Sequence, residues 1–128
     1  MVYKRGTVAE YFSNIASPDD FRICMGDFLD DFYSADNDER LRMVWTPIDL
    51  RKAANNRRYA AFFAAMTEHL CWRYEIECPL WTQEAIYRLP TPWFLHENWR
   101  FRAWQLTMTP PAFKSRNIFG GDDLLSRV

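Results

Sequence analysis

The sequence predicts an all-α fold: a compact bundle of about five or six helices around one buried central helix, followed by an irregular C-terminal tail. Only four of the 128 residues are glycine, and runs rich in Val and Thr, which favour strands, are few. Good helix formers such as Ala, Leu, Arg and Glu are frequent. The length fits one helical domain over residues 1–128, whose tail begins at about residue 109.

Segment 55–74 is predicted to be the central helix. Its large apolar residues recur at helical spacing, at Tyr59, Phe62, Phe63, Met66, Leu70 and Tyr74. Small apolar residues cover much of its remaining surface, at Ala60, Ala61, Ala64, Ala65 and Cys71. A helix that is apolar nearly all round is buried by its neighbours. The other helices are therefore expected to pack around this segment.

Two helices are predicted at the start of the chain. Residues 7–16 form a short first helix. The second covers residues 17–33 and begins with strong start signals, because Ser17 suits the N-cap and Pro18 suits the first helical position. Its apolar residues recur every three or four positions and predict one buried face. They are Phe21, Cys24, Met25, Phe28, Leu29 and Phe32.

A third helix is predicted after Asp36, which is a good N-cap residue. Its expected inward residues are Leu41, Val44 and Trp45. Residues 46–49 repeat a start signal, so the helix is expected to break and restart there. The restarted segment, 47–54, either continues into the central helix or breaks from it at Asn55-Asn56, and the sequence favours neither alternative.

Two more helices are predicted after the central helix ends near Glu75. A short helix covers residues 82–89, two prolines hold residues 89–94 extended, and a last helix covers residues 97–107. The expected inward residues of these helices are Ala85, Ile86 and Leu89, and then Trp99, Ala103 and Leu106. A capped turn at 109–113 leads into the tail.

The sequence predicts a cytoplasmic protein without membrane association. Lys4 and Arg5 are not followed by the uninterrupted apolar stretch of a signal peptide. No apolar run approaches the roughly 20 residues that span a bilayer. The three cysteines, Cys24, Cys71 and Cys78, lack the spacing of a disulfide framework, which favours a reducing compartment.

The sequence contains no motif typical of catalysis, metal binding or nucleotide binding. Its two histidines, His69 and His96, belong to no C-x-x-C or H-E-x-x-H pattern of a zinc site. No serine lies in a G-x-S-x-G turn, and Gly120-Gly121 lacks the Lys-Ser/Thr of a phosphate loop. We therefore expect no catalytic residues, no cofactor and no metal, with a hydrolase or metal enzyme as a remote alternative.

Charge is unevenly distributed, although the net charge is only −1. Residues 1–40 carry nine acidic and four basic residues, whereas residues 41–128 carry eight acidic and twelve basic ones. Either a basic remainder packs beside an acidic first layer, or a basic face is open to an acidic partner. Arginines interleaved with aromatics at 99–102 make nucleic-acid binding an alternative, although the isoelectric point of about 6.1 is low for a dedicated binder.

The tail combines large apolar residues with no helical or strand period. They are Phe113, Ile118, Phe119, Leu124, Leu125 and Val128. So many apolar side chains in a short segment are an aggregation risk when they face water. Either the tail docks on the helices of its own domain, or it is covered by a partner.

Several short motifs resemble those of a small, uncharacterised family of bacterial helical domains. They lie at 68–70, 79–82, 92–94, 109–113, 116–119 and 124–127. The most characteristic is Thr109-Pro110-Pro111-Ala112-Phe113, and the resemblance extends from about residue 18 to the C-terminus. Some members are joined to a helix-turn-helix segment, which this sequence lacks, or are encoded beside a nucleotidyltransferase-like protein. The resemblance implies an antitoxin-like component and no catalytic residues.

Together these observations predict a non-enzymatic protein-interaction or regulatory protein, antitoxin-like in the sense of the resemblance. Another protein is the expected partner, with nucleic acid or a second copy of the chain as alternatives. The recognition surface is expected on the basic, aromatic last third of the chain. The candidate partner-binding residues are Arg100, Arg102, Phe113, Lys114, Arg116, Asn117 and Phe119.

Overall fold

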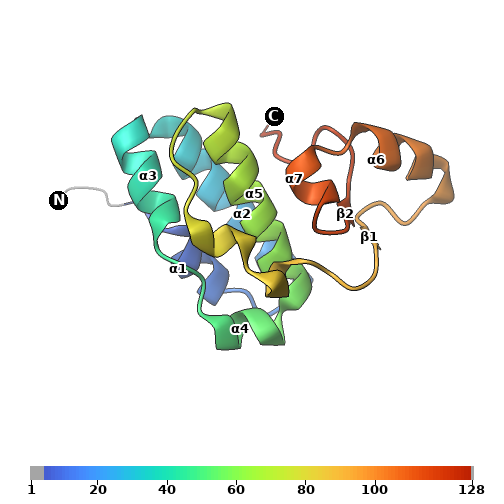
Figure 1. Ribbon diagram of the computed structural model, residues 1–128, viewed down its shortest axis with the longest axis horizontal. Coiled ribbons are helices and arrows are strands. Elements are labelled where there is room, and N and C mark those ends of the chain that lie inside the picture. Colours follow the sequence, from blue (N-terminus) through green and yellow to red (C-terminus); the bar gives the residue numbers. More distant parts are fainter. Residues whose placement is uncertain (1–4, 128) are drawn as a thin grey trace.

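The computed structural model describes residues 5–127 and contains seven α-helices, three 3₁₀ helices and one two-stranded parallel sheet in that range (Figure 1). The α-helices are α1 (Val8–Ser13), α2 (Pro18–Ser34), α3 (Asn37–Trp45), α4 (Leu50–Asn55), α5 (Arg57–Arg73), α6 (Arg102–Met108) and α7 (Pro111–Lys114). The 3₁₀ helices are η1 (Leu80–Gln83), η2 (Ala85–Tyr87) and η3 (Trp99–Phe101), and the strands are β1 (Trp93–Phe94) and β2 (Ile118–Phe119).

The predicted all-α class is confirmed, because helices make up most of the described residues and the sheet has only two short strands. The helices are more numerous than predicted, since several expected segments are divided. None of the helices within residues 5–127 is both long enough and apolar enough to cross a bilayer. The predictions that concern Lys4 and Val128 lie outside the described residues.

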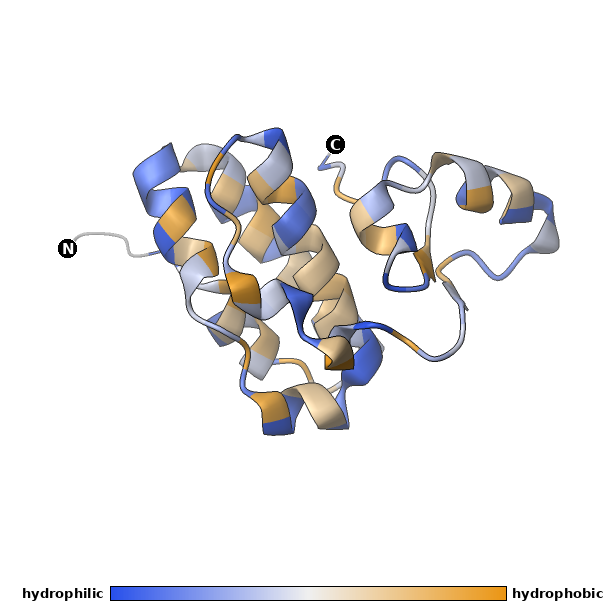
Figure 2. Cartoon of the chain, in the orientation of Figure 1, coloured by the Kyte–Doolittle hydropathy of each residue, from blue (hydrophilic) through white to orange (hydrophobic). Residues whose placement is uncertain are grey.

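Helix α5 is buried at the centre of the fold, as its sequence predicts. Its buried residues are Ala60, Ala61, Phe62, Phe63, Ala64, Ala65, Met66, Thr67, Leu70 and Cys71. Helices α1, α4, α7, η1 and η2 all contact it, and Figure 2 shows hydrophobic colours over most of its middle. The alanines leave room for close neighbours, while the phenylalanines fill the space between them.

The predicted helix starts at Ser17 and Asp36 are present, whereas the restart expected at 46–49 comes later than predicted, with Asp49 as the N-cap of α4. Each of these side chains accepts a hydrogen bond from a backbone N–H two or three residues further on, at 2.8–3.2 Å. The predicted buried face of α2 is also confirmed by its buried residues. In α3, by contrast, Trp45 was expected to point inward, but it is half exposed and Met43 is buried beside Val44.

Helices α4 and α5 are separate, which decides between the two alternatives for residues 47–54. Asn56 lies between them with φ −133° and ψ 56°, outside the helical region. Arg57 then anchors the start of α5, because its guanidinium donates to the carbonyl oxygens of Ile86 and Arg88 at 2.8 and 2.9 Å. The break therefore lets the chain turn before it enters the core.

The short helix predicted at 82–89 is wrong: the chain forms η1 and η2 instead. Glu84 separates them with the extended ψ of 139°. Ala85 is exposed, and Tyr87 is buried in its place. Tertiary contacts decide this geometry, because the Trp81 indole donates to the Val44 carbonyl at 2.9 Å and packs edge-to-face on Tyr87. One regular helix would not satisfy these anchors together.

The helix predicted at 97–107 is present as η3 followed by α6, but its orientation differs from the prediction. Trp99, Ala103 and Leu106 face solvent instead of the core. Gln105 is fully buried and Trp104 is partly buried on the opposite side. A helix is present at the predicted position. The side of it that was predicted to face the core faces solvent instead.

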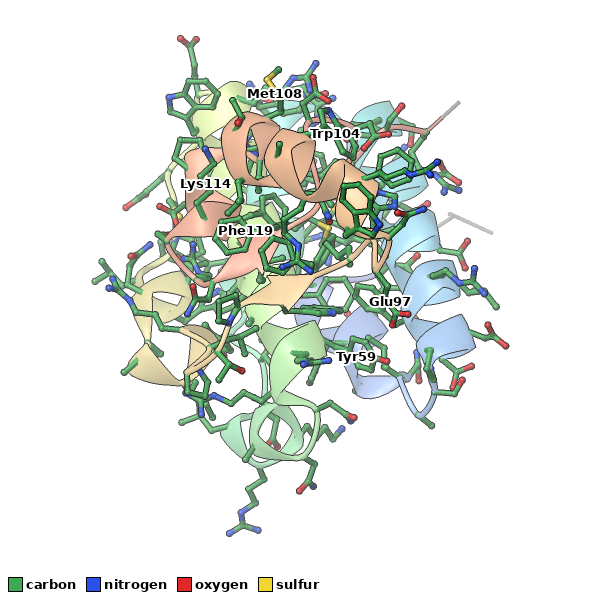
Figure 3. The ribbon with its side chains drawn as sticks, turned by 90° about the vertical axis from the view of Figure 1, so that its right-hand side faces the viewer. Tyr59, Glu97, Trp104, Met108, Lys114 and Phe119 are labelled. Atoms are coloured by element: carbon green, nitrogen blue, oxygen red, sulfur yellow. The ribbon has the colours of Figure 1, made fainter. Side chains whose placement is uncertain are left out.

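The C-terminal lobe, residues 93–127, packs on α5 through α7 (Figure 1). Strands β1 and β2 pair in parallel, with Trp93 opposite Ile118 and Phe94 opposite Phe119. Tyr33 on α2 donates to the Leu125 carbonyl at 2.7 Å. The tail therefore docks on its own chain, the first of the two alternatives. Figure 3 views this lobe from the side that carries α6.

Candidate functional site

Two of the predicted partner-binding residues, Phe113 and Arg116, are internal. Phe113 is fully buried, and its ring meets Phe62 edge-on at a centroid distance of 5.1 Å. Arg116 is 3% exposed and forms an ion pair with Glu68 on α5. Including these two residues in a recognition surface was therefore wrong, because they hold the lobe to the central helix.

Asn117 and Lys114 also form contacts within the chain. The Asn117 side-chain amide donates to the Leu89 carbonyl at 2.9 Å. Its backbone φ of 65° turns the chain from α7 into β2. Lys114 Nζ donates to the Thr107 carbonyl at 3.0 Å, which connects α7 to the end of α6. Both side chains are partly buried and support the lobe.

The remaining candidates, Arg100, Arg102 and Phe119, lie nearer the surface. The Arg102 guanidinium lies 3.9 Å from the centre of the Phe94 ring. Phe119 stacks on the same ring with centroids 5.0 Å apart and planes 20° apart. Arg100 is exposed beside Trp99. Both arginines are thus positioned at the edge of the segment that carries α6.

An apolar helix face that meets solvent is the main surface feature of this segment. We call Trp99, Ala103 and Leu106 the α6 apolar face; Trp99 is 75% exposed and Leu106 46%. Phe101 and Met108 flank it at 48% and 46% exposure, and Figure 3 shows Met108 at the far end of α6. Ala103 and Leu106 are three residues apart and share one side of α6, and Trp99 precedes them in η3.

The backbone beneath the α6 apolar face is fixed by buried polar contacts. The Gln105 amide accepts from the His96 N–H and donates to the His96 carbonyl, each at 3.0 Å. The Thr109 hydroxyl oxygen accepts from the N–H groups of Gly120 and Gly121 at 3.0 and 2.9 Å. These bonds orient the segment, so the exposure of its apolar side is a property of the folded lobe.

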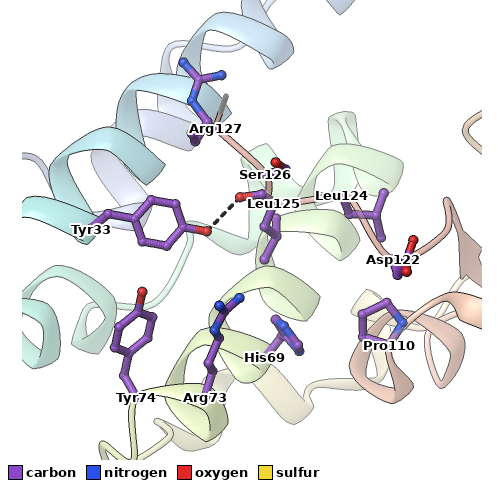
Figure 4. Close-up of a pocket in the computed structure, with 10 residues that line it drawn as sticks. All are labelled: Tyr33, His69, Arg73, Tyr74, Pro110, Asp122, Leu124, Leu125, Ser126 and Arg127. Atoms are coloured by element: carbon purple, nitrogen blue, oxygen red, sulfur yellow. Dashed lines mark hydrogen bonds between the residues drawn. The ribbon is translucent and has the colours of Figure 1, made fainter.

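A cavity of about 340 Å³ lies where the tail crosses the end of α5 (Figure 4). Tyr33 on α2 forms one wall, and His69, Arg73 and Tyr74 from α5 form the floor. The tail closes the opposite side through Leu125 and its neighbours. The hydrogen bond from Tyr33 to Leu125 holds this side in place. Docking of the tail thus creates the cavity.

Two ionisable groups of the cavity, His69 and Tyr33, have shifted pKa values. Burial lowers the pKa of His69 below its usual value, and the positive charge of Arg73 lowers it further. Burial raises the pKa of Tyr33, and Tyr74 adds to this effect. The lowered pKa of His69 favours its uncharged imidazole, and the raised pKa of Tyr33 favours its protonated hydroxyl.

Comparison with protein-family models, curated proteins and solved structures finds no match. The family resemblance therefore stays a prediction. No group of three or more His, Cys, Asp or Glu side chains in the described range 5–127 is placed to hold a metal ion.

Sequence reasoning missed the α6 apolar face and the cavity in part. It found the spacing of the α6 apolar face but placed Trp99 and Leu106 in the core. The cavity had no local signal, because Tyr33 and Leu125 are more than ninety positions apart in the chain. The arginines interleaved with aromatics at positions 99–102 were the sequence signal in this segment.

Proposed function

We propose that this protein is a non-enzymatic interaction protein that binds another protein through the α6 apolar face. The exposure of Trp99 on η3 and Leu106 on the α6 helix that follows it carries the proposal. An amphipathic helix that lays its apolar side in a groove uses anchors at this spacing. Tryptophan is also among the residues that contribute most to binding energy at interfaces.

The charge around the face favours a partner with an acidic rim. Arg100 and Arg102 are exposed beside Trp99 and Phe101. Their positive charges would meet carboxylates around an apolar groove, which increases the association rate and fixes orientation. An antitoxin-like or regulatory role rests on the family resemblance. The free thiols of Cys24, Cys71 and Cys78 fit action in a reducing cytoplasm.

Nucleic-acid binding is less well supported, because several arginines are already engaged within the chain. Arg57 donates to carbonyls of η2 and its neighbour, and Arg116 is buried. Arg102 and Phe119 occupy the Phe94 ring, whose faces a nucleobase would need for stacking. Protein binding makes direct use of the exposed aromatic side chains and is therefore preferred.

Affinity capture with matched variants tests the proposal. The immobilised protein and its Leu80→Gln variant should retain the same partner from an extract of the native host, whereas a Trp99→Gln, Leu106→Gln variant should lose it. Leu80 is the control because it is apolar, 87% exposed and located on η1. Retention of identical proteins by all three would refute the proposal. Sedimentation of the purified protein distinguishes self-association, which the double variant would then abolish.

A further inference from the structure

Three polar groups at the floor of the cavity form no hydrogen bond or ion pair with any residue of the described range, although the rings of His69 and Tyr74 pack against other aromatic side chains. Within residues 5–127, the guanidinium of Arg73, the hydroxyl of Tyr74 and the imidazole of His69 form no hydrogen bond or ion pair. Arg127, the other cation of the cavity, is already bound to Asp30 at 3.0 and 3.2 Å. Arg73, which is exposed to solvent at the mouth of the cavity, is thus the cation of the cavity that no residue within 5–127 engages.

The three groups converge on one region of the cavity. Figure 4 shows them side by side on α5, with the Arg73 guanidinium directed toward Leu125 and the Tyr74 hydroxyl directed toward Tyr33. The arrangement offers one positive charge, a hydroxyl donor and a ring nitrogen. Sites of this composition hold oxyanions, because a guanidinium can donate two parallel hydrogen bonds to carboxylate or phosphate oxygens.

The rest of the cavity fits an apolar body. Leu124, Leu125 and Pro110 line it together with the aromatic ring of Tyr33. Asp122 lies at the end away from the tyrosines (Figure 4), where its negative charge would repel an anionic group. The volume is at the lower end of the range for small-molecule sites, which suits a ligand with one ring or a short chain.

We propose that this cavity binds a small organic anion. Its carboxylate or phosphate oxygens are held by Arg73, Tyr74 and His69. Its apolar body packs between Tyr33 and the leucines of the tail. The site is independent of the α6 apolar face, so this proposal stands or falls separately from the proposed protein partner.

The two histidines provide a direct test by nuclear magnetic resonance. The imidazole signals of His69 should shift and saturate when benzoate or phenyl phosphate is added, whereas those of His96, which does not line the cavity, should stay unchanged. Comparison of benzoate, phenyl phosphate and inorganic phosphate distinguishes carboxylate from phosphate recognition. Benzyl alcohol, which lacks the charge, should produce little shift.

Variants of the anion-binding groups complete the test. Arg73→Gln should weaken binding by about tenfold or more, because it removes a charged hydrogen-bond donor. Arg73→Lys should retain part of the affinity, and Arg51→Gln, an exposed arginine on α4, should retain all of it. Parallel shifts of both histidines, no saturation at about 10 mM of any anion, or unchanged binding by Arg73→Gln would overturn the proposal.

Discussion

The guanidinium of Arg116 forms an ion pair with the carboxylate of Glu68, with Nη1 2.5 Å from Oε2. Arg116 lies between α7 and β2, and Glu68 lies on α5, so the pair joins the C-terminal lobe to the central helix. The guanidinium also donates to the carbonyl oxygens of Ala112 and Thr82 at 2.7 and 2.8 Å. One side chain therefore connects three segments of the chain.

Replacing Arg116 with methionine should lower the free energy of unfolding by about 3 kcal/mol, because it leaves buried carbonyls and a half-buried carboxylate without a partner. Urea denaturation measures this change. Arg22→Met is the control, since its pair with Asp19 is largely exposed and should be worth less than about 1 kcal/mol. Equal effects of the two substitutions would contradict a structural role for Arg116.

Gln105→Met should destabilise the protein by about 2 kcal/mol, because the N–H and carbonyl of His96 lose their hydrogen-bond partner while the buried volume is nearly kept. Thermal unfolding followed by circular dichroism measures the effect. Gln83→Met changes an exposed glutamine on η1 and should have little effect. A neutral result at position 105 would mean that the amide pair does not anchor the segment.

Ala64→Leu should lower the free energy of unfolding by about 1–3 kcal/mol, because a larger side chain does not fit the fully buried back of α5. Ala54→Leu adds the same atoms to an exposed position on α4 and should change stability by less than about 0.5 kcal/mol. Denaturant titration compares the two variants. Tolerance of leucine at position 64 would contradict close packing around α5.

The Cys78 thiol should ionise more readily than an ordinary cysteine. A hydrogen bond from Cys71 lowers the pKa of Cys78 to about 6, and a hydrogen bond from Thr82 contributes. Ultraviolet absorbance of the thiolate against pH measures this value. Cys71→Ala should raise the pKa of Cys78 toward its usual range, whereas Cys71→Ser, which keeps a hydroxyl donor, should raise it less. An unchanged midpoint in Cys71→Ala would exclude this cause.

The same shift has a consequence for stability. The pKa of Cys78 is depressed in the folded state, so between about pH 6 and its ordinary value of 9.0 the unfolded chain binds more protons than the folded one. The contribution of Cys78 to stability is therefore present above pH 9 and is lost as the pH falls through about 6. The difference between the wild type and Cys78→Ala in unfolding free energy should follow this trend.

The parts of the fold that local sequence determines could be predicted. Caps such as Ser17 and Asp36 act within one turn of helix, and the apolar surface of α5 leaves no polar side to face water. The direction of the α6 apolar face could not be predicted, because spacing identifies a face but not what covers it. The contact between Gln105 and His96 decides that direction, and neither residue belongs to an apolar pattern.

The cavity could not be predicted for a related reason. It depends on how the tail folds back, which is fixed by the contact of Tyr33 with a backbone carbonyl at Leu125 and by the pairing of Arg127 with Asp30. Neither contact can be predicted from the spacing of residues in the sequence. From the sequence, Arg73 and Tyr74 resemble the ordinary polar end of a helix. Only the position of the tail in the structure shows that they line a cavity.

The two hydrogen bonds between the Gln105 amide and the backbone of His96 hold residues 96 and 105 next to each other, so the short chain between them leaves and rejoins the body at one place. Segments with such adjacent ends can change in length or sequence without displacing their anchor points, because doubling a loop costs only about 0.6 kcal/mol. The exposed residues 97–103 are therefore a natural position for grafting foreign segments, and for divergence among descendants of this chain while the bundle stays constant.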